Sequence, residues 1–437
     1  MIRPDEIVTA LGGRVMEGMG VPFLQQGRIG QDSLSSFARS SKAWARVGPA
    51  KWAELSTNVA RYELHELAGE LHLALTLESS GTNLLGHSAA MSSTLASWGA
   101  GSTGEAYSAA TSVIQGQSAY MFTGGALSTA GKAGLYQDVT VSSTWVALSA
   151  IVEQRDAAPF AFRIGLAAST SYIVSGELGW GGDLTVSRGV GASTTVPARG
   201  HVERLGTGPN GGRAYRVGIS ALMAASTAAT QRVEIFPTNN STTTGQRTYL
   251  HHAQLSQFPH VRRVMVSTSS SPATREGETL TLPSVAVPGG PLSLYQELIL
   301  YDRPGGGSGT EPLASTAGTA TRMELVRGWT STDGTKYVAG GSFENRGLFA
   351  WAGSTGAGMV PGQRLEEALS LSTAGQLKYQ YRLDGGTVYT AVSTGVVYPV
   401  SRTNQAPSYA VDNNQMILAS VIARGVHSLE DFSGLFR

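Results

Sequence analysis

Carboxylates and histidines are the side chains of this chain that could carry out chemistry, since it contains no cysteine. Hydrolysis of a glycosidic bond needs two carboxylates about 5–10 Å apart that flank the bond. Glu366 and Glu367 are adjacent, so in a strand they point to opposite faces. Glu78 stands alone at the end of LTLE, and no ExDxxE run is present. The carboxylates give no support for a hydrolytic site.

Metal and cofactor motifs are absent or incomplete. The eight histidines show no HExxH spacing, and thiolate ligands are excluded. His251 and His252 lie in an expected strand, so we expect one in the core or an interface and the other in solvent. The glycine strings at 99–104, 206–211 and 305–312 lack the strand, helix or Lys-Ser/Thr that nucleotide sites require. We expect no cofactor and no metal.

Aromatic side chains could bind sugars by stacking against the apolar faces of pyranose rings. The residues with this potential are Trp180, Asp183 close behind it, Trp329 and Trp351. Each tryptophan has an equally simple alternative, which is burial in a sandwich core. Trp98 and Trp145 are expected in the core.

Short strands are the elements that must position these residues. Apolar and β-branched residues alternate from about residue 50, and turn-forming clusters separate the runs. The clearest runs are LHLALTL (71–77), FAFRIGLA (160–167), YRVGISALM (215–223), QRVEIF (231–236), LSLYQELILYD (292–302) and LKYQYRLDGGTVYTAV (377–392). The pattern predicts an all-β protein with two β-sandwiches in tandem, at 51–283 and 289–437.

The first fifty residues have a different pattern. The pattern of residues 5–19 predicts a short helix. A roughly helical spacing also relates Leu34, Phe37, Ala38 and Trp44, and the helix-breaking pair Gly48-Pro49 follows them. We expect residues 1–50 to form a partly helical arm, with a wall of the next domain as the alternative. A last short helix is expected after Ser428, with Asp431 three residues on.

Composition limits the function classes further. The chain has 437 residues, of which 32 are Lys or Arg and 31 Asp or Glu, so no large basic field exists for nucleic acid. Charged residues make up 14%, and 55 residues are glycine. We expect no signal peptide at the N-terminus and no membrane-spanning segment. Short strands, tight turns and surfaces covered in a larger assembly fit this composition.

Several motifs follow one another in an order that resembles a known family. These are Arg61-Tyr62, LHLALTLE (71–78), TNLL (82–85), GRAYRV (212–217), TREGETLTLP (274–283) and ILASVIARGVHSLEDFSGLF (417–436). Over residues 58–437 the chain resembles structural proteins of tailed-bacteriophage virions. The resemblance implies a carbohydrate-binding-module-like jelly roll followed by a concanavalin- or laminin-G-like sandwich.

The segment LTLESSGTNLL (75–85) then has a structural interpretation. Leu73, Leu75 and Leu77 face a core, Glu78 accepts hydrogen bonds from backbone amides of the turn that follows, and Asn83 fixes the next turn. Chemistry at Glu78 is the alternative.

The resemblance implies a virion component, a head spike or a tail fibre or tip protein, that binds host surface polysaccharide. Residues 1–50 would attach it to other virion proteins, and a homo-oligomer, with a trimer as our guess, is expected. It would be assembled in the host cytoplasm and would not be an enzyme. Two alternatives stay open, a capsule-degrading depolymerase and a cementing protein of capsid or tail that binds no ligand.

Overall fold

A computed structural model describes most of the chain as antiparallel β-sheet. The described residues are 7–12, 36–67, 70–78, 80–89, 91, 97–100, 106–124, 134–142, 145–166, 171–194, 198–224, 229–236, 245–258, 261, 263–281, 291–300, 309–315, 321–329, 337–345, 348–354, 363–395, 408–409 and 415–433. Among them the only helix is the short α1 (Leu429–Ser433). The predicted all-β sandwich class is confirmed. None of the described helical residues forms a span long and apolar enough to cross a membrane.

The chain folds into two compact units, neither of which is continuous in sequence. Unit 1 comprises Met1–Ser40, Thr57–Ser79 and Glu276–Arg437, and unit 2 comprises Ser41–Ser56 and Ser80–Arg275. Unit 2 is thus inserted into unit 1. These boundaries differ from the predicted ranges 1–50, 51–283 and 289–437.

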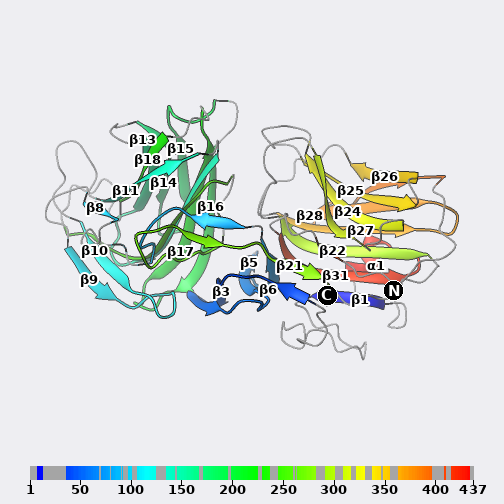
Figure 1. Cartoon of the computed structure of the whole chain (residues 1–437), viewed down its shortest axis with the longest axis horizontal. Coiled ribbons are helices and arrows are strands. Elements are labelled where there is room, and N and C mark those ends of the chain that lie inside the picture. The colour runs from blue at the N-terminus through cyan, green and yellow to red at the C-terminus, as the bar shows by residue number, and fades with distance from the viewer. Residues whose placement is uncertain are drawn as a thin grey trace. The chain divides into compact units, whose positions relative to one another are not determined.

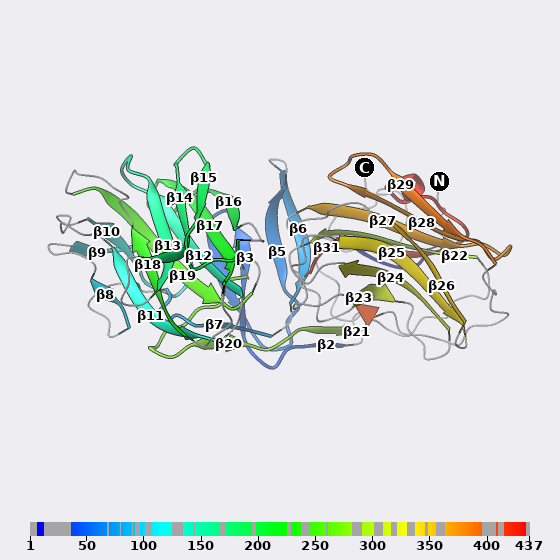
Figure 2. The ribbon, with the colours of Figure 1, turned by 90° about the horizontal axis from the view of Figure 1, so that it is seen from above.

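Unit 2 is a sandwich of two antiparallel sheets (Figures 1 and 2). The first sheet has the order β16 (Arg199–Thr207), β17 (Arg213–Leu222), β12 (Trp145–Gln154), β19 (Arg247–Ser256), β10 (Ala119–Thr123) and β9 (Ala106–Ala110). The second has the order β15 (Leu184–Arg188), β14 (Tyr172–Leu178), β13 (Phe160–Leu166), β18 (Ala229–Phe236), β11 (Leu135–Val141) and β8 (Gly99–Ala100). Their facing side chains, including Leu148, Phe162, Val217 and Ile235, form one buried core.

A third layer covers the other face of the first sheet of unit 2. The hairpin β3 (Ala43–Gly48) and β4 (Lys51–Leu55) places Trp44 and Trp52 in a separate buried cluster with Ile151 of β12. The short pair β7 (Gly81–Asn83) and β20 (Ala273–Arg275) completes the unit.

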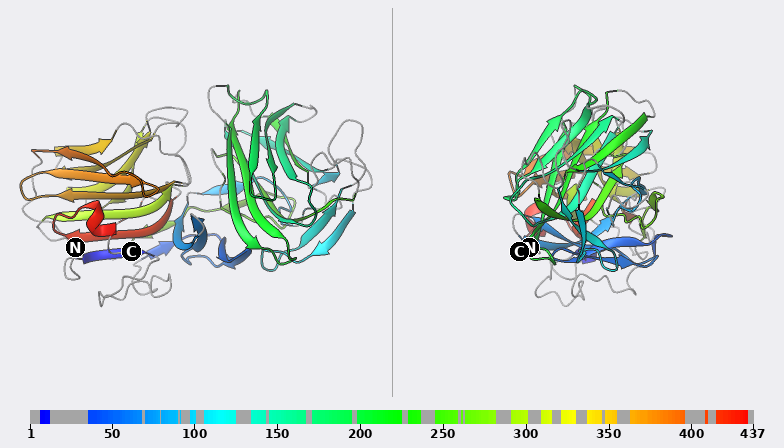
Figure 3. Two further views of the ribbon diagram at one scale, coloured as in Figure 1. Left: turned by 180° about the vertical axis from the view of Figure 1, so that it is seen from behind. Right: turned by 90° about the vertical axis from the view of Figure 1, so that its left-hand side faces the viewer.

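Unit 1 contains two further antiparallel sheets. One has the order β29 (Tyr389–Ser393), β28 (Leu377–Leu383), β27 (Arg364–Leu371), β22 (Leu292–Leu300), β31 (Gln415–Arg424), β6 (Glu70–Leu77) and β5 (Tyr62–Leu67), and β1 (Ile7–Gly12) also pairs with β31. The other has the order β2 (Ser36–Ala38), β21 (Thr279–Thr281), β30 (Ser408–Tyr409), β23 (Gly309–Ser315), β24 (Thr321–Trp329), β25 (Tyr337–Asn345) and β26 (Leu348–Ser354). Figure 3 shows α1 in red against the first of these sheets, where Phe432 stacks on Tyr295.

The predicted helices of the N-terminal arm are wrong wherever the structure describes this region. Residues 7–12, 36–38 and 43–48 are the strands β1, β2 and β3, each hydrogen-bonded to another strand. On β3 the residues Ala43 to Arg46 are all buried, so both faces of the strand are covered and no alternation is visible in its sequence. The arm's residues 1–6 and 13–35 lie outside the described residues.

Candidate functional site

A groove lies on the outer face of the second sheet of unit 2. Its lining comes from β13, β14, β15 and the end of β18, and it encloses about 250 Å³. The residues that line it are Ala161, Phe162, Arg163, Tyr172, Ser175, Gly176, Glu177, Thr185, Ser187 and Phe236. We call it the sheet-face groove. It combines the partly exposed ring of Tyr172 with hydroxyls, a guanidinium and a carboxylate, a set typical of carbohydrate sites.

Strand alternation explains why these side chains gather on one face. On β18, Val233 and Ile235 point into the core, whereas Arg232 and Glu234 point outward. A bulge in the pairing of β13 with β14 at Ile164/Gly165 lets Ile173 and Val174 both enter the core. Because the bulge adds one residue, Tyr172 lies on the same outer face as Ser175 and Glu177.

Paired charges hold the polar side chains of this face in place. Arg163 donates hydrogen bonds from Nε and Nη2 to the two carboxylate oxygens of Glu234, which lies opposite it on β18. Arg232 and Asp138 form a second bidentate pair across β18 and β11, with N–O distances of 2.7 and 2.8 Å. Hydrogen bonds from Arg232 lower the pKa of Asp138, so this carboxylate is ionised at neutral pH. Such forks fix side-chain orientation before a ligand arrives.

Aromatic rings support the two guanidinium groups. The Arg163 guanidinium carbon lies 5.2 Å from the centre of the Phe236 ring, and that of Arg232 lies 4.2 Å from the centre of the Tyr136 ring. The cation–π contact and the ion pair with a carboxylate together fix the orientation of each guanidinium group. Arg163 is 24% exposed and Glu234 17%, so both can still meet a ligand from solution.

Trp180 does not provide the exposed platform that the sequence analysis considered. It is 7% exposed, belongs to the sandwich core, and donates a hydrogen bond from Nε1 to the carbonyl of Ala158 at 2.7 Å. Asp183 is exposed, and its backbone carbonyl closes the turn by accepting a hydrogen bond from the Gly179 amide. The structure therefore assigns Trp180 to packing. Trp98 and Trp145 are buried as expected.

Trp329 and Trp351 lie on strands of unit 1. Trp329 ends β24 and is paired with Gly309 and Tyr337, and Trp351 is paired on β26 with Ser342. Their side chains lie outside the described part of the chain. Their predicted role in binding a ligand stays a prediction.

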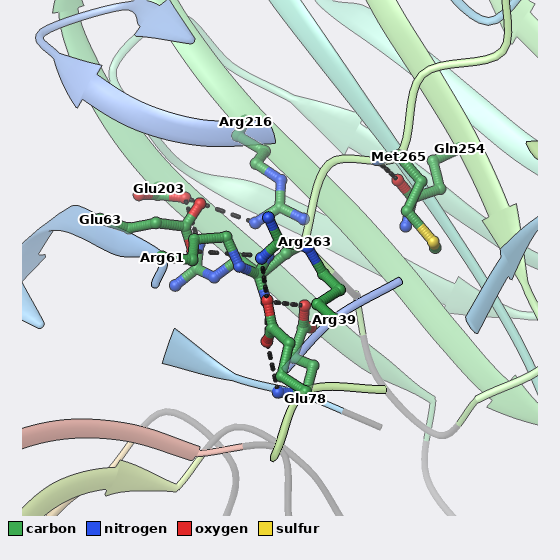
Figure 4. A network of polar contacts seen from close by, with 10 residues as sticks. Arg39, Arg61, Glu63, Glu78, Glu203, Arg216, Gln254, Arg263 and Met265 are labelled. Atoms are coloured by element: carbon green, nitrogen blue, oxygen red, sulfur yellow. Dashed lines mark hydrogen bonds and ion pairs between the residues drawn. The ribbon is translucent and has the colours of Figure 1, made fainter. Parts of the chain in front are cut away.

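Glu78 is buried in an ion-pair cluster of unit 1 (Figure 4). Its carboxylate accepts a hydrogen bond from the Arg61 guanidinium at 2.6 Å, and Arg61 also contacts Glu278 at 2.9 Å. Burial would lower the pKa of Arg61, but the surrounding carboxylates, Glu278 foremost, raise it above its ordinary value. Glu78 thus pairs with a guanidinium group from an earlier part of the chain. From the sequence it was expected to accept hydrogen bonds from backbone amides of the turn that follows it.

Asn83 fixes the turn after β7, which is the role expected from the sequence. Its side-chain oxygen accepts hydrogen bonds from the amides of Leu85 and Leu255, both at 3.1 Å. Its amide nitrogen donates to the carbonyls of Met265 at 2.8 Å and Ala253 at 3.3 Å. The first of these bonds fixes the turn after β7, and the others attach that turn to β19 and to the segment that follows it.

One pair of carboxylates lies on neighbouring strands of unit 1. Glu297 and Glu366 lie opposite each other on β22 and β27, and Arg364 contacts both at 2.7 and 2.8 Å. Glu366 also pairs with Arg382, and both carboxylates are buried. Guanidinium groups thus occupy the positions where a glycosidic bond would have to lie. This pair does not provide a hydrolytic site.

The histidine pair is buried on both sides, which corrects the expectation that one member faces solvent. His251 and His252 are 0% and 1% exposed. His252 donates a hydrogen bond from Nε2 to the Met265 carbonyl at 3.1 Å, because a carbonyl oxygen can only accept, so Nε2 carries the proton. Within the described residues, no group of three or more His, Asp or Glu side chains could hold a metal.

The sheet-face groove was not predicted from the sequence. The signal was present in FAFRIG (160–165) and QRVEIF (231–236), where Arg163, Arg232 and Glu234 alternate with core residues. Each motif by itself is an ordinary half-buried strand. Only the pairing of β13 with β18 brings Arg163 opposite Glu234.

Comparisons with known proteins do not assign a family. No family model matches the chain, and no curated protein matches it. Among solved structures, a Trypanosoma rangeli sialidase in complex with the inhibitor DANA matches at 9% identity and a TM-score of 0.23. The same sialidase with sialic acid matches at 10% identity and a TM-score of 0.21. Both alignments cover 88% of this chain, which spans 64% of the sialidase chain. At such TM-scores nothing about this chain is inferred from the likeness.

Proposed function

We propose that this chain is a structural component of a bacteriophage particle whose unit 2 binds host surface polysaccharide through the sheet-face groove. The observation that carries the proposal is the groove itself, with the partly exposed Tyr172 and the Arg163–Glu234 pair on one sheet face and Phe236 buried under the Arg163 guanidinium. The ordered motifs that resemble virion proteins support the place of the chain in a particle.

The chemistry of the groove fits a chain of sugar residues. Hydroxyl groups of Ser175, Thr185 and Ser187 and the carboxylate of Glu177 line it beside the aromatic rings. Sugar hydroxyls both donate and accept hydrogen bonds, so a surface with donors and acceptors fixed side by side suits them. An open sheet face also accommodates a polymer that continues at both ends.

A glycan-array screen with the purified full chain tests this proposal, followed by size analysis of any polysaccharide that binds. We expect binding without shortened chains. Tyr172→Ala and Arg163→Met should each weaken binding at least about tenfold, which corresponds to about 1.4 kcal/mol. Arg155→Ala, an exposed arginine outside the groove, is the matched control and should bind as the wild type does.

Three results would overturn the proposal. Binding that both groove variants retain, with unchanged melting temperatures, would place the site elsewhere, and no binding to any glycan would favour the cementing protein. Shortened chains would replace the receptor-binding role by a depolymerase. Attachment to other virion proteins through residues 1–50 and a trimeric state stay predictions.

A further inference from the structure

A second pocket in unit 2 lies between three loops, away from the outer face of the second sheet. It encloses about 350 Å³, within the range of small-molecule sites. Its lining residues are Pro49, Ala50, Lys51, Ser112, Val113, Gln115, Thr207, Gly208 and Pro209. We call it the loop pocket. None of these residues lines the sheet-face groove.

Two of the three loops are fixed by a buried carboxylate at the end of β12. Glu153 accepts hydrogen bonds through Oε1 from the amides of Asn210 and Gly212, at 2.9 and 2.8 Å. The Asn210 side chain bonds Glu153 Oε2 at 3.0 Å and both the amide and the carbonyl of Thr111. The 207–212 and 111–115 loops are therefore joined through one side chain.

A buried histidine completes this support. The Val113 amide donates to His251 Nδ1 at 3.4 Å, so Nε2 carries the proton and donates to Glu153 at 3.2 Å. Burial lowers the pKa of His251, although Glu153 opposes this, so the ring is neutral. Burial would raise the pKa of Glu153, but hydrogen bonds from His251, Gly212 and Asn210 lower it below its ordinary value. The carboxylate is charged and its acceptor positions are filled by the loops.

The third loop is the two-residue connection of the β3–β4 hairpin. Trp52 ties it to the 112–115 loop, because its amide donates to the Val113 carbonyl and its carbonyl accepts from the Gln115 amide. Ala50 has a φ of 42°, a strained value for a residue with a Cβ. All three walls are thus preformed, so little ordering would be needed on binding.

The lining indicates the class of ligand. Lys51 is exposed and is the only charged residue among the nine, which include no carboxylate. Pro49 and Pro209 offer apolar faces, and Ser112, Gln115 and Thr207 offer hydrogen-bonding groups. An ammonium beside apolar and hydroxyl-bonding walls suits a sugar ring that carries a carboxylate.

We propose that the loop pocket binds an acidic sugar residue, of the uronic acid type, with its carboxylate at Lys51. This inference rests on the proposed function, which it specifies further. Acidic sugars are units of bacterial surface polysaccharides, the proposed ligands of the chain. The binding itself does not depend on the sheet-face groove. Each site can therefore fail alone.

Ligand-observed NMR titration of the full chain with sodium glucuronate and with glucose tests the loop pocket. We expect saturable glucuronate binding in the millimolar range that weakens between 25 and 300 mM NaCl, since an exposed ion pair is screened. Lys51→Met keeps the apolar stem and should weaken glucuronate binding about fivefold or more, with little effect on glucose. Lys42→Met removes an exposed ammonium that pairs with Glu54 on the same hairpin, so it is the matched control and should leave glucuronate binding unchanged.

The outcomes separate the two sites. Loss of glucuronate binding in Arg163→Met but not in Lys51→Met would overturn the loop-pocket assignment, as would the absence of saturable binding in the wild type. Glu153→Gln removes the charge that holds the loops and should weaken glucose and glucuronate alike. Glycan-array binding that is lost in Tyr172→Ala while glucuronate binding persists would support both sites independently.

Discussion

At the scale of single residues, buried neutral histidines give unit 2 a dependence on pH. Burial lowers the pKa of His252 to about 3, with Arg216 adding to the effect and the Met265 carbonyl opposing it. In the unfolded chain a histidine has a pKa of about 6.5. Between these values the unfolded state binds more protons, so the stability is complete above about pH 6.5 and is lost as the pH falls.

We expect His252 to lower the unfolding free energy of unit 2 by about 2 kcal/mol between pH 7 and pH 5. His252→Gln keeps a donor for the Met265 carbonyl and should flatten this part of the pH profile. Urea titrations at pH 7, 6 and 5, followed by tryptophan fluorescence, measure the slope. Equal slopes in the wild type and the variant would contradict the prediction.

Residue roles were predictable from the sequence only where the partner is near in the chain. Asn83 bonds the amide of Leu85, two residues on, and its turn was predicted. Glu78 was predicted to bond backbone amides of the turn after its strand, yet its partner is Arg61, 17 residues earlier. Glu153 is the glutamate at a strand end that does hold loop amides, and those loops lie some 57 residues further on. Sequence spacing cannot show such contacts.

At the scale of elements, the β3–β4 hairpin stabilises unit 2 by covering one sheet. Trp52 is 2% exposed and packs with Ile151 and Ala214 of that sheet. Trp52→Ala should lower the unfolding free energy by about 3–5 kcal/mol, because it removes a large buried ring and leaves a cavity. Thermal and urea unfolding measure the loss.

A change on the exposed side of the same hairpin provides the control. Val47 is 47% exposed, so Val47→Ala should change stability by less than about 0.5 kcal/mol. If Trp52→Ala cost no more than Val47→Ala, the hairpin would not be a structural layer. If it abolished folding, Trp52→Phe should retain most of the stability and restore the comparison.

The strands with period-two alternation were predictable, and β13, β17, β18 and β28 fall where the pattern placed them. The N-terminal strands were not predictable, because the residues that cover them and pair with them come from distant parts of the chain. On β3 both faces are buried, and β1 finds its partner β31 more than 400 residues away along the chain. The sheet-face groove was missed for a related reason, since its lining is assembled by strand pairing from runs that each read as ordinary strands.

At the scale of the whole molecule, the division into two units depends on long-range pairing that composition does not reveal. β6 was expected in the first sandwich, but it pairs with β31 in unit 1 at residues 415–417. The second sandwich was predicted to begin at residue 289, whereas the chain enters unit 1 again at Glu276. A fragment that begins at residue 284 therefore lacks β2, β5, β6 and β21, all of which belong to unit 1.

We expect the 284–437 fragment to aggregate, because β31 loses β6 and presents an unpaired edge with apolar side chains.

Unit 1 should instead fold when unit 2 is replaced by two short Gly-Ser linkers. The Glu278 amide bonds the Glu78 carbonyl at 3.0 Å and the Asn58 amide bonds the Arg39 carbonyl at 3.0 Å, so one linker from 79 to 276 and one from 40 to 57 need span little distance. We would measure the soluble yield, the circular dichroism and the cooperativity of thermal unfolding of the two proteins to establish which of them folds. A soluble, cooperatively folding 284–437 fragment, or a linked unit 1 that does not fold, would show that the compact units are not the folding units of this chain.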